Sequence, residues 1–168
     1  MKTIYVIRHA KSSWNMIDIP DEQRPLVEKG KKRTMRVIDY LNENHIKVDY
    51  IVTSHAVRAH ETAKILAHAL KYPIENIKID PHIYHADGDA ILNQFYDLPD
   101  RFDSVMIVGH NPSLTDFVNL FLDSPFENLP TSGLVSFSFD TDHWGKVPVS
   151  DRKTNFILFL KDMPGKEE

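Results

Sequence analysis

Short apolar segments, separated by longer amphipathic stretches, constrain the fold of this sequence more than any other feature. Six of them have the length and the Val, Ile and Phe content of β-strands, and turn-forming or charged residues flank them. They are Thr3–Ile7, Tyr50–Thr53, Ile77–Ile79, Ser104–Val108, Leu134–Phe139 and Asn155–Leu160. The sequence therefore predicts a β-sheet built from six short strands.

Helical patterns lie between most of these segments. They run from Lys31 to Asn44, from Ser54 to Leu70, from Asp87 to Tyr96, and from Ser113 through Phe121. Ser54, Asp87 and Ser113 are residue types that cap helix N-termini. The first helix is expected to bury Met35, Ile38 and Leu41. Alternating strands and helices predict an α/β domain whose first four strands are mostly parallel, with one later strand antiparallel at an edge.

Length and composition exclude several classes of protein. The 168 residues are expected to form one domain over residues 1–162, with a frayed tail at 163–168. With 20 basic and 24 acidic residues the net charge is −4, which argues against general nucleic-acid binding. The chain has no cysteine, which excludes disulfides and thiolate chemistry. It has no apolar run near the ~20 residues of a membrane span and no signal peptide, so a cytoplasmic protein is expected.

Basic and imidazole side chains follow three of the expected strands. Arg8 and His9 follow the first strand, Ser54 and Arg58 follow the second, and His110 follows the fourth. Because ligands bind beyond the carboxyl ends of strands in an open α/β sheet, these side chains are expected to meet at one edge. Guanidinium groups match phosphate oxygens, and helix N-termini add oriented N–H groups. The pattern predicts a site for a phosphate- or sulfate-like anion.

Each of these residues, taken singly, also has an ordinary structural interpretation. A histidine at a strand end is more often a turn residue than a catalyst, and Arg58 alone would be a surface charge. Convergence on one edge is what favours the anion site. His82 and His85 have no third ligand nearby, so no metal site is predicted. No glycine-rich nucleotide loop occurs, and no cofactor is expected.

Several motifs in order resemble the histidine phosphatase superfamily, and more narrowly the SixA-type phosphohistidine phosphatases. The first is Arg8-His9-Ala10-Lys11-Ser12-Ser13-Trp14, which is similar to their R-H-A-K-S-x-W. The others are Arg24-Pro25-Leu26 with Gly30, Ser54-His55-Ala56-Val57-Arg58-Ala59 with Glu61-Thr62-Ala63, Val108-Gly109-His110-Asn111-Pro112, and Leu129-Pro130-Thr131. His55 departs from the pattern, in which proline is usual. The motifs extend along nearly the whole chain.

The resemblance implies a fold and a set of roles. The fold would be a three-layer α/β structure, with a mostly parallel mixed sheet flanked by helices. His9 would be the nucleophile that takes the phosphoryl group, and Arg8, Arg58 and His110 would hold its oxygens. Asn15 falls where related mutases have a phosphate-contacting asparagine. The reaction would need no metal, because guanidinium groups supply the positive charge.

The substrate is harder to predict than the reaction. Relatives that act on sugar phosphates use a glutamate after the third strand as general acid, and residues 83–87 contain none. His85 and Asp87 are the nearest candidate proton donors. Because imidazole leaves without such an acid, the expected substrate is phosphohistidine on a histidine-containing signalling protein. The alternatives are a phosphomonoesterase for small metabolites and a phosphoprotein-binding module without catalysis.

A run of basic residues occupies the expected first helix. It consists of Lys29, Lys31, Lys32, Arg33 and Arg36. A solvated helix face is the favoured interpretation, and a docking surface for an acidic partner is the alternative.

Overall fold

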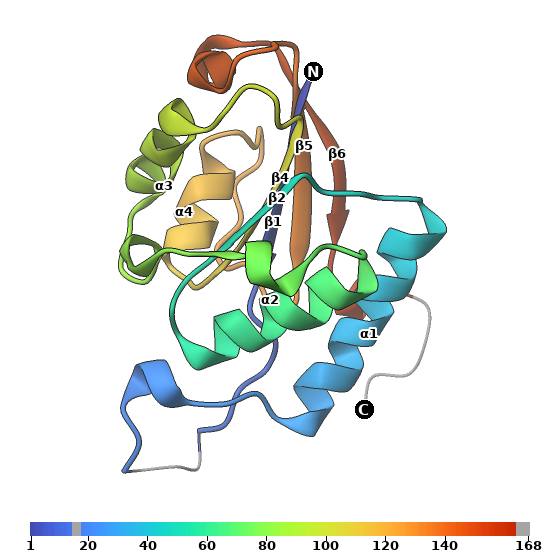
Figure 1. Cartoon of the computed structure of the whole chain (residues 1–168), viewed down its shortest axis with the longest axis vertical. Helices are drawn as coiled ribbons and strands as arrows, with labels where there is room; N and C mark the ends of the chain where they lie inside the picture. Colours follow the sequence, from blue (N-terminus) through green and yellow to red (C-terminus); the bar gives the residue numbers. More distant parts are fainter. Residues whose placement is uncertain (15–17, 164–168) are drawn as a thin grey trace.

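The computed structural model describes residues 1–14 and 18–163 (Figure 1). Its centre is one six-stranded sheet with the strand order β3-β2-β4-β1-β5-β6. The strands are β1 (Lys2–Arg8), β2 (Tyr50–Thr53), β3 (Lys78–Ile79), β4 (Ser104–Gly109), β5 (Leu134–Phe139) and β6 (Arg152–Leu158). All six predicted strands are present, although β6 begins and ends earlier than the apolar pattern indicated.

The strand directions confirm the predicted parallel half of the sheet. β1 and β2 both pair in parallel with β4, and β3 pairs in parallel with β2. One of the last two strands, β5, is antiparallel as predicted, but its expected place at an edge was wrong, because β5 lies between β1 and β6. Every residue of β5 is buried, whereas β6 is largely exposed. A strand buried on both faces belongs in the interior of a sheet.

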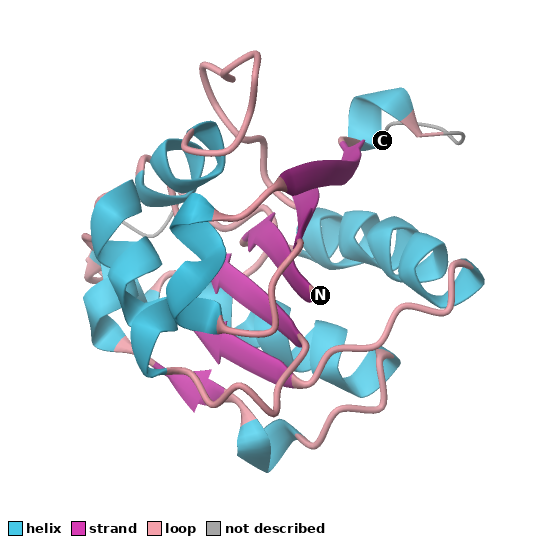
Figure 2. Cartoon of the chain, turned by 90° about the horizontal axis from the view of Figure 1, so that it is seen from above, coloured by secondary structure: helices cyan, strands magenta, loops and turns pink. Residues whose placement is uncertain are grey.

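Helices cover both faces of the sheet and complete three layers (Figure 2). On one face lie α1 (Glu28–Glu43) and α2 (Val57–Ala69), and on the other lie α3 (Gly88–Gln94) and α4 (Ser113–Asn119). Each face has its own apolar core, one containing Ile7, Leu41 and Leu66 and the other Ile4, Ile91 and Phe117. The predicted α/β class, a mostly parallel mixed sheet flanked by helices, is confirmed.

The buried face of α1 is rotated from the predicted one. Met35 is 49% exposed, while Gly30, Thr34, Val37, Ile38 and Leu41 are buried. Thr34 tolerates burial because its hydroxyl donates to the carbonyl of Gly30 and lies 3.3 Å from the hydroxyl of Ser132. A polar residue with hydrogen-bond partners therefore takes the place that the hydrophobic pattern gave to Met35.

Two of the three predicted caps were wrong. Asp87 caps α3, since its carboxylate accepts from the backbone N–H of Ala90. Helix α2 begins only at Val57, with Ala56 as its N-cap, and Ser113 is already the first residue of α4. Ser54 instead directs its hydroxyl toward His110, as described below.

Strand register brings the carboxyl ends of β1, β2 and β4 to one edge. Arg8 pairs with Gly109, and Thr53 pairs with Val108. The next residues along the chain are His9, Ser54 and His110. The sheet therefore delivers three chemically active segments to one place.

Two predicted features lie outside the described residues. They are Asn15 and, apart from Met163, the tail at 163–168. Within residues 1–14 and 18–163, no helix has the length and hydrophobicity needed to span a membrane.

The loop that follows β1 rests directly on α1 at Gly30. A methyl group on Gly30 would collide with the carbonyl oxygen of Lys11 and lie 2.9 Å from its backbone nitrogen. We expect Gly30→Ala to lower the free energy of unfolding by about 1–3 kcal/mol, because backbone cannot yield as a flexible side chain does. Chemical denaturation measures this. Gly145→Ala is the control, since its methyl group would meet Tyr96 at an ordinary 3.4 Å. Equal stability of the two variants would contradict this packing.

Candidate active site

Four side chains from the three strand ends surround one cavity. His9, Arg58 and His110 are buried, and the ring centroids of His9 and His110 are 5.2 Å apart. Together with Arg8 they line a cavity of about 290 Å³. The predicted convergence of these residues on one edge of the sheet is therefore present in the structure.

The contacts of His9 leave one ring nitrogen with a free lone pair. Its Nδ1 lies 2.7 Å from the carbonyl oxygen of Ala10, which can only accept, so Nδ1 carries the proton. Nε2 is then unprotonated and accepts a long hydrogen bond of 3.4 Å from Nε of Arg58. A neutral imidazole with its Nε2 lone pair facing a guanidinium group is arranged for attack on an electrophile.

The tautomer of His110 depends on the direction of its hydrogen bond with Ser54. The Ser54 hydroxyl oxygen accepts from the backbone N–H of Ala56 and lies 2.6 Å from Nε2 of His110. A hydroxyl that donates to Nε2 leaves the ring proton of His110 on Nδ1. Among the described residues, that buried Nδ1 has no hydrogen-bond partner. In this tautomer Nδ1 of His110 is a donor, as an anion site requires.

Arg8 presents a second donor of the same kind. Its Nη1 donates to the carbonyl of Leu129 at 3.1 Å, while its buried Nε has no partner among residues 1–14 and 18–163. Buried donors without partners are costly and uncommon in folded proteins. These two nitrogens, Nε of Arg8 and Nδ1 of His110, belong to side chains that line the same cavity.

Burial keeps both imidazoles uncharged at neutral pH. Desolvation lowers the pKa of His9 to about 3, helped by the nearby positive charges of Arg58 and Arg8. Burial likewise lowers the pKa of His110 to about 2, with His9 and Arg58 adding to the effect. The site therefore holds two neutral imidazoles beside the positive charges of Arg8 and Arg58.

Asp21 is a site residue that the sequence patterns missed. It lies in a short 3-10 turn, Asp21–Gln23, and its carboxylate accepts from Arg58 at 3.0 Å and from Arg24 at 2.9 Å. The hydroxyl of Tyr84 donates to the same carboxylate. Asp21 follows no strand, so the strand-end rule could not find it. Its position three residues before the Arg24-Pro25-Leu26 motif was the available signal.

Arg24 and Trp14 line one side of the cavity that His9 also lines. The guanidinium of Arg24 is buried, donates to the carbonyl of Ser13 at 3.1 Å, and lies 3.8 Å from the centre of the Trp14 ring. The Trp14 side chain is itself exposed. The Trp14 ring therefore covers the guanidinium of Arg24.

A second cavity of about 220 Å³ adjoins the first. The two share Asp21, Arg58, His110 and Asn111. Tyr84 and His85 line the second cavity, and their rings are 4.2 Å apart. His85 is thus beside the cluster, whereas Asp87 is absent from both linings and caps α3. Of the two candidate proton donors, only His85 is near the cluster.

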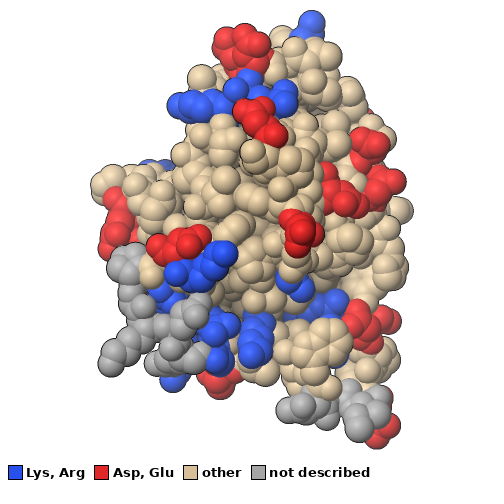
Figure 3. Space-filling view, turned by 180° about the vertical axis from the view of Figure 1, so that it is seen from behind, with Lys and Arg blue, Asp and Glu red and all other residues tan. Residues whose placement is uncertain are grey.

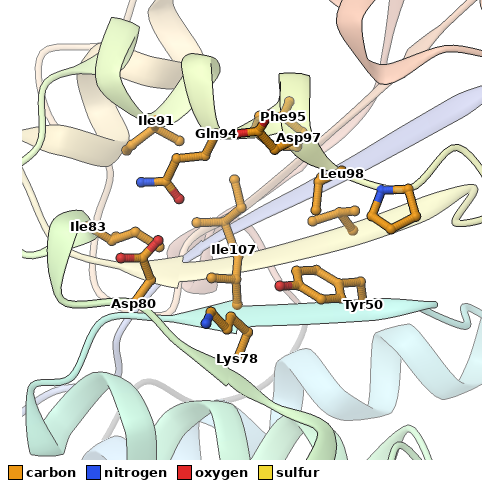
Figure 4. A pocket seen from close by; sticks show the side chains of 13 residues that line it. Tyr50, Lys78, Asp80, Ile83, Ile91, Gln94, Phe95, Asp97, Leu98 and Ile107 are labelled. Carbon is orange, nitrogen blue, oxygen red and sulfur yellow. The ribbon is translucent and has the colours of Figure 1, made fainter.

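A third cavity lies away from this cluster, between α3 and the sheet (Figure 4). Its volume is also about 290 Å³, and its floor is mostly apolar, with Ile83, Ile91 and Ile107 among the lining residues. It shares no residue with the other two cavities. It contains neither an imidazole nor an arginine, so it offers no comparable chemistry.

The predicted basic run lies on α1. Lys and Arg side chains gather on the lower part of the face in Figure 3, the end of the molecule where α1 begins in Figure 1. Lys31 pairs with Glu28 at 3.3 Å, and Arg36 donates to the carbonyls of Leu160 and Met163. Arg36 therefore ties α1 to the C-terminal segment. Among residues 1–14 and 18–163, no group of three acidic or imidazole side chains could hold a metal ion.

Sequence comparison identifies the family. The profile of the histidine phosphatase superfamily (branch 1) matches residues 4–82. An uncharacterized protein of Picosynechococcus sp. is 30% identical over 122 residues, which cover 68% of this chain and 69% of the relative. The chain belongs to the histidine phosphatase superfamily and is a hydrolase of the phosphatase class.

Solved structures share the fold. One from Agrobacterium tumefaciens, assigned as the phosphohistidine phosphatase SixA, has a TM-score of 0.79 at 22% identity, covering 94% of this chain and 97% of that one. The protein histidine phosphatase SixA complexed with tungstate has a TM-score of 0.80 at 17% identity, covering 95% and 98%. A mycobacterial glucosyl-3-phosphoglycerate phosphatase has a TM-score of 0.66 at 12% identity, covering 92% and 97%.

The pKa values of the two buried imidazoles can be tested directly. We expect ¹⁵N NMR of the imidazoles to find His9 and His110 neutral at pH 4.5 in the folded protein, because burial lowers both pKa values far below 6.5. The unfolded chain takes up protons below pH 6.5 that the folded chain does not, so stability falls as the pH drops from about 6.5 toward 3. The variants His9→Asn and His110→Asn should each weaken this pH dependence. Titration of either ring near pH 6.5 would refute the described environment.

Proposed function

We propose that this chain is a metal-independent phosphatase that hydrolyses phosphohistidine on a protein through a phosphorylated His9. The observation that supports the proposal is the pairing of a neutral His9 with two buried nitrogens, Nε of Arg8 and Nδ1 of His110, that have no partner among the described residues. A transferred phosphoryl group brings the charged oxygens that these donors lack. Fixed donors around the phosphoryl group are what such a reaction needs.

In the first step the phosphoryl group moves from the substrate to His9. The Nε2 lone pair of His9 forms a bond to phosphorus while the bond between phosphorus and the substrate nitrogen breaks. The electron pair of that bond stays on the substrate imidazole, which leaves neutral because its other nitrogen already carries a proton. Arg58 shifts its Nε–H from the His9 lone pair, 3.4 Å away, to a phosphoryl oxygen.

In the second step water releases the phosphate. The water oxygen bonds to phosphorus, the bond from phosphorus to Nε2 of His9 breaks, and its electron pair returns to Nε2. Both water protons remain with the product, dihydrogen phosphate, which then exchanges protons with solvent. Throughout both steps Nδ1 of His9 keeps its proton on the carbonyl of Ala10, 2.7 Å away.

The surroundings of the leaving group favour a nitrogen leaving group. Alkoxide leaving groups need an enzyme acid, and residues 83–87 contain no glutamate. The carboxylate of Asp87 accepts from the backbone N–H of Ala90 at the start of α3. Asp21 is ionised, because hydrogen bonds from Tyr84 and Arg58 outweigh the effect of its burial and lower its pKa to about 2. Substrate imidazole can depart without a donor, so the site suits phosphohistidine better than a sugar phosphate.

Access to the site also favours a protein substrate. Trp14 is 77% exposed at one cavity, and His85 is exposed at the other. Residues 80–104 between β3 and β4 hold only short helical elements, which leave little material for a lid. A phosphorylated side chain still attached to a partner protein, such as a histidine-containing signalling protein, can then reach His9.

A phosphomonoesterase for small metabolites is the second candidate. It is favoured by the fold shared with the mycobacterial glucosyl-3-phosphoglycerate phosphatase and by His85, an imidazole beside the cluster that could act as proton donor. The third candidate is a module that binds a phosphoprotein without turning it over. Two buried imidazoles disfavour it, because arginines alone suffice for binding.

A trapping experiment tests the covalent step. Brief incubation with ³²P-labelled substrate and an alkaline quench should leave label on wild-type protein that is stable to base and lost in acid. His9→Ala should carry no label and lose at least about 10³-fold in turnover, because the nucleophile is gone. His110→Gln, which keeps His9, should still become labelled. Phosphate binding by wild type without any labelled protein would favour the binding module.

A comparison of substrates tests the substrate class. We expect kcat/KM for a phosphohistidine-containing protein to exceed that for sugar phosphates and nucleotides by at least about 100-fold, because only the nitrogen leaving group departs without an acid. Steady-state phosphate release measures both. Arg58→Ala should slow all substrates and serves as the control for contaminating phosphatase. A preference for a metabolite would replace this proposal with the second candidate.

A further inference from the structure

Asp21 occupies the junction of three segments that the reaction must hold together. Its carboxylate and its backbone carbonyl both accept from Arg58 on α2, at 3.0 Å and 2.7 Å. Arg24, three residues further along, donates to Oδ1, and Tyr84 from the segment after β3 donates to Oδ2. Each of the two terminal nitrogens of Arg58 thereby donates a hydrogen bond to Asp21. Only Nε of Arg58 faces His9.

The carboxylate keeps capacity for one further hydrogen bond. A carboxylate offers about four acceptor positions. Arg58 and Tyr84 use two on Oδ2, and Arg24 uses one on Oδ1. The Asp21 side chain is 49% exposed, although its arginine partners are buried. Counted over the described residues, one acceptor position on Oδ1 is therefore open to a ligand.

The position of Asp21 places that acceptor on the path of the leaving group. Asp21 lines both the cavity of His9 and the adjoining cavity of Tyr84 and His85. In an in-line transfer the leaving group points away from Nε2 of His9, and a leaving group that extends into the adjoining cavity passes Asp21, which both cavities share. The aromatic ring of Tyr84, 5.2 Å from that of His110, provides a flat wall there.

The charge of Asp21 decides which leaving groups it can assist. An ionised carboxylate has no proton to give to an alkoxide. It can accept a hydrogen bond from the N–H of a phosphorylated imidazole and so keep that proton on the ring, as the aspartate of an Asp–His pair does. A ring protonated on its far nitrogen is the form whose bond to phosphorus breaks most readily.

We propose that Asp21 is a specificity-determining residue, whose carboxylate binds the N–H of the departing imidazole and so selects phosphorylated nitrogen over phosphorylated oxygen. This inference rests on the proposed phosphohistidine phosphatase function and adds a substrate contact to it. In the transfer step the carboxylate gains and loses no proton. The hydrogen bond strengthens the hold of the ring on its own proton while the electron pair from the broken bond to phosphorus settles on the other nitrogen.

Two substrates with unequal leaving groups test the proposal on the full chain. A phosphohistidine peptide offers an imidazole N–H, whereas p-nitrophenyl phosphate leaves as a phenolate and offers none. For Asp21→Asn we expect the ratio of kcat/KM for the peptide to kcat/KM for p-nitrophenyl phosphate to fall at least tenfold. A loss of kcat/KM that comes from a displaced Arg58 affects both substrates, so it cancels in this ratio.

Glu22→Gln is the matched control. It removes one negative charge from the neighbouring, exposed residue of the same turn, whose carboxylate is not part of the cluster. Its ratio should stay within twofold of wild type. A melting temperature of Asp21→Asn within a few degrees of wild type shows that the fold is kept.

Two results would overturn the inference in distinguishable ways. If wild type hydrolyses the peptide and Asp21→Asn slows both substrates equally, then Asp21 acts only by positioning Arg58, and the proposed function stands. If wild type hydrolyses p-nitrophenyl phosphate but not the peptide, the proposed function fails and the inference fails with it.

Discussion

The contact between the guanidinium of Arg58 and the ring of His9 is the constraint on which the rest of the site depends. A guanidinium 3.4 Å from an imidazole nitrogen is tolerable only if that imidazole is neutral and its lone pair faces the donor. The carbonyl of Ala10 enforces this state by taking the proton of Nδ1. Asp21 in turn holds the other end of Arg58 with its carboxylate and its backbone carbonyl. His9, Arg58 and Asp21 thus form a single chain of contacts.

The fold serves this chain of contacts by bringing three strand ends together. Two sets of hydrogen bonds fix the loop after β1. The backbone N–H of Ser132, just before β5, donates to the carbonyls of Arg8 and His9, and the backbone N–H of Ala10 donates to the hydroxyl of Thr62 on α2. The Thr62 hydroxyl also donates to the carbonyl of Arg58, so it links the loop that carries His9 to helix α2, which carries Arg58. Burial keeps the two imidazoles neutral, and it raises the free-energy cost of leaving Nε of Arg8 and Nδ1 of His110 without hydrogen bonds.

The sequence was sufficient for the parts of the site that follow strands. Arg8, His9 and His110 come directly after apolar runs, and the rule that parallel strands end at one edge brings them together without any knowledge of packing. Asp21 and Tyr84 could not be found this way, because they reach the cluster from loops whose course depends on tertiary contacts. Ser54 was assigned to the wrong task, since a serine before a helix is ordinarily a cap and only the proximity of His110 changes its partner. Helical spacing likewise located α1 but not its rotation, because the hydrogen bonds of Thr34 are invisible to a hydrophobic pattern.

A crystal structure with tungstate bound shows whether these side chains hold a tetrahedral anion together. We expect the tungsten atom in line with Nε2 of His9, with its oxygens within hydrogen-bond distance of Nε of Arg8, Nε of Arg58 and Nδ1 of His110. Tungstate bound only at the basic run on α1, with the cavity of His9 containing water alone, would contradict it.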